Sequence, residues 1–254
     1  MDAGKSLPVN RWLPYWAVFQ ADMQQTVQSW AYRLWVIGSV LAIAGFLTYR
    51  FGAYKESTII QPSTLVIQQI LRGSILGCLT LVVVLTAGSI SGERGTLADS
   101  VLSRGISRYQ YFMGKWHSRV VTILGAFWLV GSVTTVACLF LLHDDLTLKG
   151  ALFALLAVGA IMFTVVSCCV TMSALFHSTG MSIIMAWGLL YGVTLGLSFF
   201  PSLQLSPEIT LNALPNMLRG EYDPSGLVKL YLWSGGISLG ITTVGMVIFA
   251  QKDI

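Results

Sequence analysis

Long apolar runs separated by short polar stretches dominate this chain of 254 residues. A helix that crosses a membrane needs about 20 mostly apolar residues. Six runs meet this requirement, at residues 34–50, 73–90, 119–142, 150–174, 181–200 and 227–249. The pattern predicts an all-α polytopic membrane protein with six transmembrane helices, in which residues 1–254 form a single transmembrane domain.

A different apolar pattern precedes the first run. Apolar side chains recur at intervals of three and four residues, the spacing of one helix face. They are Trp12, Trp16, Phe19, Met23, Val27, Trp30 and Leu34. Polar residues such as Gln20, Asp22 and Gln24 fill the other faces. We expect an amphipathic helix over residues 12–33 that lies in the membrane interface with its tryptophans at headgroup depth. A soluble helix packed on a partner is the alternative.

The composition agrees with a membrane location. The chain is 55% hydrophobic and 10% charged, whereas a soluble protein has about 25% charged residues. The net charge of +4 does not indicate nucleic-acid binding, because the basic residues flank apolar runs instead of forming a stripe. Cys78, Cys138, Cys168 and Cys169 lie inside apolar runs without CxxC spacing, which predicts small buried side chains and no metal or redox site.

The basic residues predict the orientation, because cytoplasmic loops carry an excess of lysine and arginine. With both termini in the cytoplasm, that side holds nine of the 15 lysines and arginines. The nine are Lys5, Arg11, Arg33, Arg94, Arg104, Arg108, Lys115, Arg119 and Lys252. Five of them lie in the single stretch 91–119. We therefore expect cytoplasmic termini.

On the opposite side, residues 201–226 form an extracytoplasmic loop with four of the seven prolines. Its leucines are too many for a plain solvated loop. Short helices that dip back toward the membrane would bury them, and a simple ordered cap is the alternative.

Glycines recur every fourth residue in three of the predicted spans. The repeats are Gly73 and Gly77, then Gly188, Gly192 and Gly196, then Gly236 and Gly240. Small residues let helix backbones approach closely inside a membrane. We expect each pair to pack against a helix of the same chain, with an interface to another subunit or a moving helix as the alternative.

A compact basic segment at residues 91–118 separates the second and third runs. Thr96 to Asp99 resembles a capping box with Asp in place of Glu, and Gly105 is placed to end a helix. Ser107 can cap the helix that follows. The small apolar face between these signals consists of Leu97, Val101 and Leu102. The segment predicts a short amphipathic helix in the cytoplasm between two spans.

The residues that stand out in this segment are Glu93, Gly95, Thr96, Leu97, Leu102, Ser103, Ile106, Ser107, Arg108, Gly114 and Lys115. Together they resemble the signature of type-2 ABC transporter permeases, in which an acidic residue and Gly-Thr-Leu lead into a coupling helix. Residues 249–254 resemble the usual end of that family. Two positions depart from the pattern: Ser91 stands where many relatives carry a first acid, and Gly105 where proline is frequent.

The resemblance implies a permease subunit of an ABC exporter in a prokaryotic plasma (inner) membrane. A homodimer, or a heterodimer with a similar permease, would form the path. A separate ABC ATPase subunit, which would hold ATP and Mg, would dock on the loop. The chain itself would bind no cofactor. Gly114-Lys115 is followed by Trp116, so the phosphate-binding GxxxxGK[ST] motif is missing and we expect no ATP hydrolysis by this chain.

The coupling residues implied by the resemblance are Glu93, Gly95, Thr96, Leu97, Val101, Leu102, Ser103, Arg104, Ser107, Arg108, Gly114 and Lys115. The apolar ones would fill a groove on the ATPase, with Arg104 and Arg108 at its rim. For Glu93 we expect capping or pairing within the loop, for instance with Arg94 or Arg108.

Two other functions compete with this one. A membrane anchor that recruits an ATPase without transporting anything would carry the same loop. An intramembrane enzyme would need a catalytic set at membrane depth, but the three histidines are scattered among loops and no two of them have the spacing of metal ligands. No span carries an acidic residue near its middle, which argues against transport driven by protons or sodium.

Overall fold

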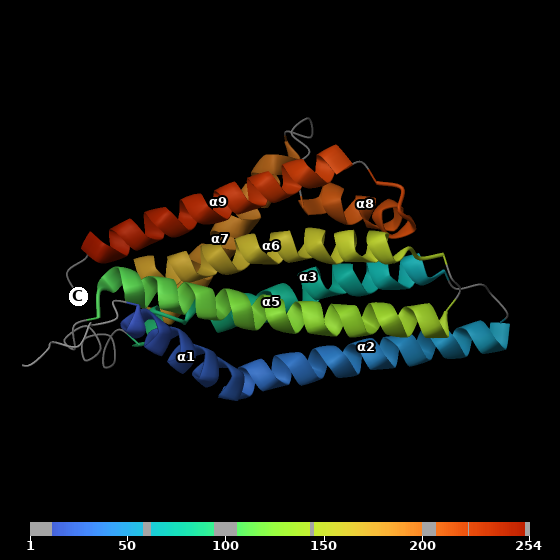
Figure 1. The fold of residues 1–254 in the computed structure, drawn as a ribbon, viewed down its shortest axis with the longest axis horizontal. Coiled ribbons are helices and arrows are strands. Elements are labelled where there is room, and N and C mark those ends of the chain that lie inside the picture. Colours follow the sequence, from blue (N-terminus) through green and yellow to red (C-terminus); the bar gives the residue numbers. More distant parts are fainter. Residues whose placement is uncertain are drawn as a thin grey trace, which may run out of the picture.

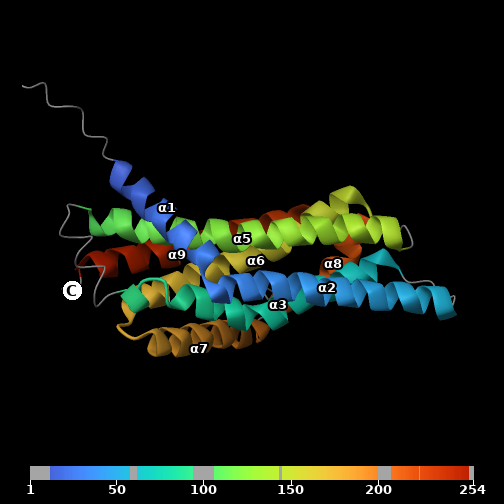
Figure 2. The same ribbon diagram turned by 90° about the horizontal axis from the view of Figure 1, so that it is seen from below.

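The computed structural model describes residues 12–57, 62–93, 106–142, 145–199, 207–222 and 224–251, and these contain helices and no strands. In chain order the elements are α1 (Leu13–Gln28), α2 (Trp30–Ser57), α3 (Ser63–Ala87), the 3₁₀ turn η1 (Ser91–Glu93), α5 (Arg108–Leu141), α6 (Leu148–Leu175), α7 (Thr179–Ser198), α8 (Pro207–Arg219) and α9 (Pro224–Gln251). The long helices lie side by side in one bundle (Figures 1 and 2).

Six of the described helices are long and apolar enough to cross a membrane. They are Trp30–Ala53, Ser63–Glu93, Arg108–Leu141, Leu148–Leu175, Thr179–Gly196 and Ser225–Gln251. The predicted all-α polytopic fold is therefore confirmed. Helix α3 begins at Ser63 and α5 at Arg108, well before the predicted spans at 73 and 119. Near a membrane, backbone N–H and C=O groups are best hydrogen-bonded by continuing the helix.

Helix α6 forms the centre of the bundle and packs against α3, α5, α7, α8 and α9. Small side chains on it, among them Ala151, Ala154 and Ala157, are completely buried and let the neighbours approach. Hydroxyl groups join it to α9, where Thr164 Oγ1 lies 2.7 Å from Ser234 Oγ. The helices α2 and α7 lie at the periphery, and most of their side chains face away from the protein.

The predicted N-terminal helix is present as α1, and its tryptophan face is exposed. Trp12 is 67% exposed and Trp16 53% exposed, so no part of the described chain covers this face. The opposite face packs on α5 and buries Val18, Asp22 and Thr26. Asp22, one of the polar residues predicted on the faces away from the tryptophans, is therefore buried, and its partners are described below.

A short helix in the predicted extracytoplasmic loop is confirmed by α8. Leu214 and Leu218 are fully buried in the same cluster as Ala151 and Ala154 of α6. The helix ends at Gly220, whose φ of +87° lies in the left-handed region that favours glycine. The loop leucines Leu203 and Leu205 lie outside the described residues.

The glycine repeats do not pack within the chain. A Cβ added at Gly188, Gly192, Gly196, Gly236 or Gly240 would meet no atom within 4 Å, and the same holds for Gly73. The expectation of packing between helices of one chain is therefore wrong for these positions. The glycines of α7 and α9 lie on peripheral surfaces, which leaves the alternative of contact with something outside the described chain, whereas Gly73 of α3 lines a cavity between α2, α3 and α5.

Candidate functional site

The basic segment between α3 and α5 enters and leaves the bundle at one end, where α1 and the end of α9 also lie (Figure 1). Residues 94–105 lie outside the described part of the chain. The predicted coupling helix therefore lies there too, with Gly95, Thr96, Leu97, Val101, Leu102, Ser103 and Arg104. Both anchors of the segment, η1 on one side and the start of α5 on the other, are described.

The predicted cap at Ser107 is confirmed and fixes where α5 begins. Ser107 Oγ accepts a hydrogen bond from the Gln110 N–H, and the Gln110 side chain accepts one from the Ser107 N–H, which completes a capping box. With the helix start fixed, side chains four residues apart fall on one face. Tyr111, Lys115 and Arg119 form such a row, and all three are buried.

These side chains meet two carboxylates from other elements, and the group formed by Asp22, Glu93, Tyr111, Lys115 and Arg119 is called the ion cluster below. Lys115 Nζ lies 2.7 Å from Asp22 Oδ1 of α1 and 2.6 Å from Glu93 Oε1 of η1. Arg119 Nη2 lies 3.1 Å from the same Asp22 oxygen. Tyr111 Oη donates to Glu93 Oε2 at 2.9 Å.

The ion cluster is charge-balanced and shielded from solvent. Two cations face two carboxylates, and the side-chain exposure ranges from 0% for Asp22 to 15% for Glu93. Attraction between charges is strong in such a place, but removing them from water costs several kcal/mol per ion. The balance therefore depends on every partner being present, because the loss of one leaves an uncompensated buried charge.

Close packing of α1 on α5 places Asp22 in this position. A Cβ added at Gly114 would lie 2.8 Å from Val18 Cγ1 and 3.3 Å from the Tyr15 carbonyl oxygen. Only glycine leaves room for this approach. Tyr15 Oη also lies 3.0 Å from Nδ1 of His117, the residue three positions after Gly114.

The end of α3 is fixed from the other side by α6 and α7. Ser173 Oγ on α6 accepts hydrogen bonds from the N–H groups of both Ile90 and Ser91, each at 2.9 Å. Ser91 Oγ lies 3.3 Å from Thr179 Oγ1 at the start of α7. Ser91, the position that departs from the family pattern, is thus a buried structural contact in the turn that precedes Glu93.

Other predicted coupling residues also have partners inside the chain. Arg108 Nη1 donates to the Ala250 carbonyl oxygen at 3.1 Å, near the C-terminal end of α9, where a helix favours a cation. Gly114 and Lys115 are buried, Gly114 against α1 and Lys115 in the ion cluster, so neither is exposed on the surface of the described chain. Glu93 pairs with Lys115 and Tyr111, so the expected pairing within the 91–118 segment is confirmed, with Lys115 as the cation.

Asp22, Tyr111 and Arg119 were not predicted as site residues. Two signals in the sequence point to Asp22 and Arg119, and neither points to Tyr111. Asp22 is the single acidic residue of the α1 stretch, and Lys115 with Arg119 places two cations one turn apart where an apolar span begins. Charges in such places are costly unless they are paired.

Among the residues that the structure describes, His, Cys, Asp and Glu side chains do not form a group of three or more able to hold a metal ion. Comparison of the chain with protein-family models gave no match, and comparison with curated proteins gave none either. The geometry and the sequence pattern are therefore the basis for a functional proposal.

Proposed function

We propose that this chain is the membrane-spanning permease subunit of an ABC exporter, driven by a separate ATPase that docks on residues 94–105. The observation that carries the proposal is the ion cluster. It joins the turn before this segment and the helix after it to α1, through Lys115 between Asp22 and Glu93. A push on the segment would therefore be passed to several helices together.

The contacts on the other side of the turn support the same role. Ser173 and Thr179 connect it to α6 and α7, and Arg108 connects the start of α5 to α9. The residues that flank the segment are thus bonded to α1, α6, α7 and α9. In the proposed orientation these flanking residues and both termini lie in the cytoplasm of a prokaryotic cell, where the ATPase and its ATP and Mg would be found.

Co-purification with a candidate ABC ATPase, sought first in the reading frames next to this one, tests the proposal. Leu97→Asp combined with Leu102→Asp places two charges on the predicted apolar face, and we expect loss of ATPase association and of ATP-dependent export. The control is Leu203→Asp with Leu205→Asp, the same change in the connection predicted on the opposite side, which should leave association intact.

Two outcomes contradict the proposal in different ways. Undiminished association and export in the Leu97 and Leu102 variant would show that coupling does not use this face. Association without nucleotide-dependent movement of any cargo would instead favour the non-transporting anchor.

A further inference from the structure

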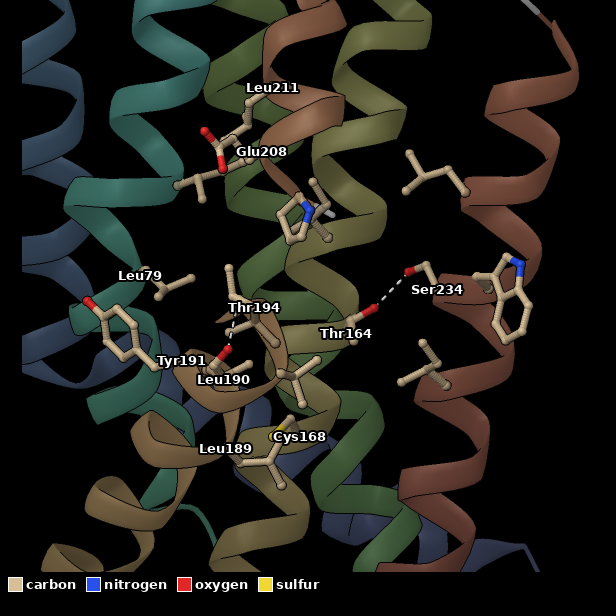
Figure 3. Close-up of a pocket in the computed structure, with 18 of the residues that line it drawn as sticks. Leu79, Thr164, Cys168, Leu189, Leu190, Tyr191, Thr194, Glu208, Leu211 and Ser234 are labelled. Carbon is tan, nitrogen blue, oxygen red and sulfur yellow. Dashed lines mark hydrogen bonds between the residues drawn. The ribbon is translucent and has the colours of Figure 1, made fainter. Parts of the chain in front are cut away.

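A cavity of about 550 Å³ lies between α7 and α9, with α3, α6 and α8 forming its other walls (Figure 3). Pockets that bind small molecules have volumes of about 300–1,000 Å³. Along α9 its lining runs from Leu230 to Ile241, which is roughly 16 Å at the helical rise per residue. The cavity is therefore long enough for an extended molecule.

Most of the cavity wall is apolar. Leu79, Leu189 and Leu190 lie around its lower part in Figure 3, together with Cys168. The hydroxyls of Thr164 and Ser234 bond each other at 2.7 Å, so they do not require a ligand. This part of the cavity fits an alkyl chain better than a polar molecule.

The other end of the cavity, next to α8, carries charge. Arg72 of α3 lines this end together with Glu208 and Asn212. Arg72 Nη2 donates to Asn212 Oδ1 and, at 3.4 Å, to the Leu211 carbonyl oxygen. A guanidinium has five N–H donors, so these two bonds to one nitrogen leave donors for another acceptor.

Arg72 lies directly before the predicted apolar span at residues 73–90. It follows Ser63, the first residue of α3, by nine positions, which places it roughly 14 Å along the helix. An arginine at the edge of an apolar span lies at the depth of the lipid head groups, where it can meet an anionic head group. Its protein partners among the described residues are a neutral amide and a carbonyl, neither of which neutralises the charge.

A second cavity, of about 620 Å³ between α2, α3 and α5, offers a contrast. Arg50 lies on its wall, but Gln69 Oε1 is 2.6 Å from Arg50 Nη2 and the Phe46 ring centroid is 5.1 Å from the guanidinium carbon. Gln69 is a neutral amide like Asn212, so the difference between the two arginines is the Phe46 ring, whose cation–π contact stabilises the charge of Arg50. The first cavity is therefore the better candidate for an anion.

We propose that the cavity between α7 and α9 binds an anionic amphiphile from the lipid phase, with its head group at Arg72 and its alkyl chain along Leu79 and Leu190. Glu208 at the same end favours a head group of low negative charge, because a second negative group would face a carboxylate. This inference rests on the proposed export function, to which it adds the chemical class of the cargo.

Photolabelling of the purified full-length chain in nanodiscs of zwitterionic lipid tests the site without any ATPase. The probe is dodecyl sulfate with a diazirine at the end of its chain, a monoanion that matches the expected head group, and dodecyl glucoside with the same diazirine is the uncharged comparison. We expect the sulfate to label residues near Leu189 and Leu190, and Arg72→Gln to weaken this labelling about tenfold through loss of a charged hydrogen bond.

Matched variants separate binding from folding. Arg50→Gln removes an arginine from the other cavity and should leave labelling unchanged, and Arg72→Lys should restore most of it. Leu190→Trp fills the cavity and should abolish labelling, whereas Leu195→Trp, at an exposed position of the same helix outside the lining, should not. If Arg72→Gln does not fold, photolabelling of the Arg72→Lys and Leu190→Trp variants still tests whether the probe occupies the cavity.

Three results would overturn the assignment. The first is equal labelling by the uncharged probe, and the second is an equal loss of labelling in Arg72→Gln and Arg50→Gln. The third is a loss of labelling in Asn212→Ala as large as in Arg72→Gln, which would mean that Arg72 acts by joining α3 to α8 and not by binding the head group. Failure of the ATPase to associate would sink the export proposal but not this site. Normal ATPase association without probe binding would sink the site alone.

Discussion

Lys115 neutralises two carboxylates that come from different parts of the chain, and its loss should be severe. In Lys115→Met, Asp22 keeps only Arg119, and Glu93 keeps only the hydroxyl of Tyr111. Breaking a buried pair by removing one partner costs about 3–5 kcal/mol. We expect a loss of this size in the free energy of unfolding, measured by denaturant titration in mixed micelles.

The control for this prediction is Lys149→Met, at an exposed position near the start of α6, which should change stability by less than about 0.5 kcal/mol. A double-mutant cycle of Lys115→Met with Asp22→Asn isolates the pair. Two additive single losses would show that the two side chains do not interact and would contradict the ion cluster.

Gly114 allows the contact between α1 and α5, and even one methyl group should disturb it. In Gly114→Ala the new Cβ meets Val18 at 2.8 Å, so α1 must move and overpacking of about 1–3 kcal/mol is expected. Gly125→Ala is a matched control in the same helix, because nothing lies within 4 Å of its added Cβ. Alanine there should be neutral or stabilising, since it is the better helix former.

Hydrogen exchange at the α1 amides is the second measurement for this prediction. Displacement of α1 in Gly114→Ala should speed exchange along Leu13–Gln28 and leave α9 unchanged. Equal stability and equal exchange in the two alanine variants would show that the contact between the helices is loose.

At the scale of elements, the turn at the end of α3 depends on a single hydroxyl of α6. Ser173→Ala removes the acceptor of two buried N–H groups, those of Ile90 and Ser91. Local opening of the turn should become easier, and exchange of these two amides should speed up about tenfold or more. Thr194→Val, which removes a hydroxyl bonded to its own helix, is the control and should leave the turn unchanged.

The helices themselves could be predicted from the sequence, but their partners could not. Runs of apolar residues located six spans, and Ser107 marked the start of α5, because both signals lie within one element. Asp22 and Lys115 are 93 residues apart, and nothing in the local pattern of either helix indicates the other. The periodic pattern places Asp22 on a polar face of its helix, but it does not indicate whether that face meets water or a buried cation.

At the scale of the molecule, the same limitation applies to the glycine repeats. A GxxxG pattern indicates a flat face, and only the arrangement of all helices decides what lies opposite. Here α7 and α9 present these faces outward, so Gly188, Gly192 and Gly236 have no neighbour within the described chain. In a membrane such faces favour contact with another helix, because close backbone approach replaces loosely packed lipid.

We therefore expect the chain to dimerise through a glycine face, and Gly192→Leu to weaken the dimer about tenfold or more, in line with losses of roughly 1–2 kcal/mol at such interfaces. Light scattering in mild detergent over a range of protein concentrations measures the dimer fraction. Gly125→Leu makes the same change on α5, at a position that is also open, and should leave dimerisation intact. Because an added Cβ meets no atom of its own chain within 4 Å at either position, thermal unfolding of the monomer should be alike in both. A chain that stays monomeric at every concentration would rule out the homodimer and leave pairing with a similar permease, whereas a dimer insensitive to Gly192→Leu would place the interface on another face.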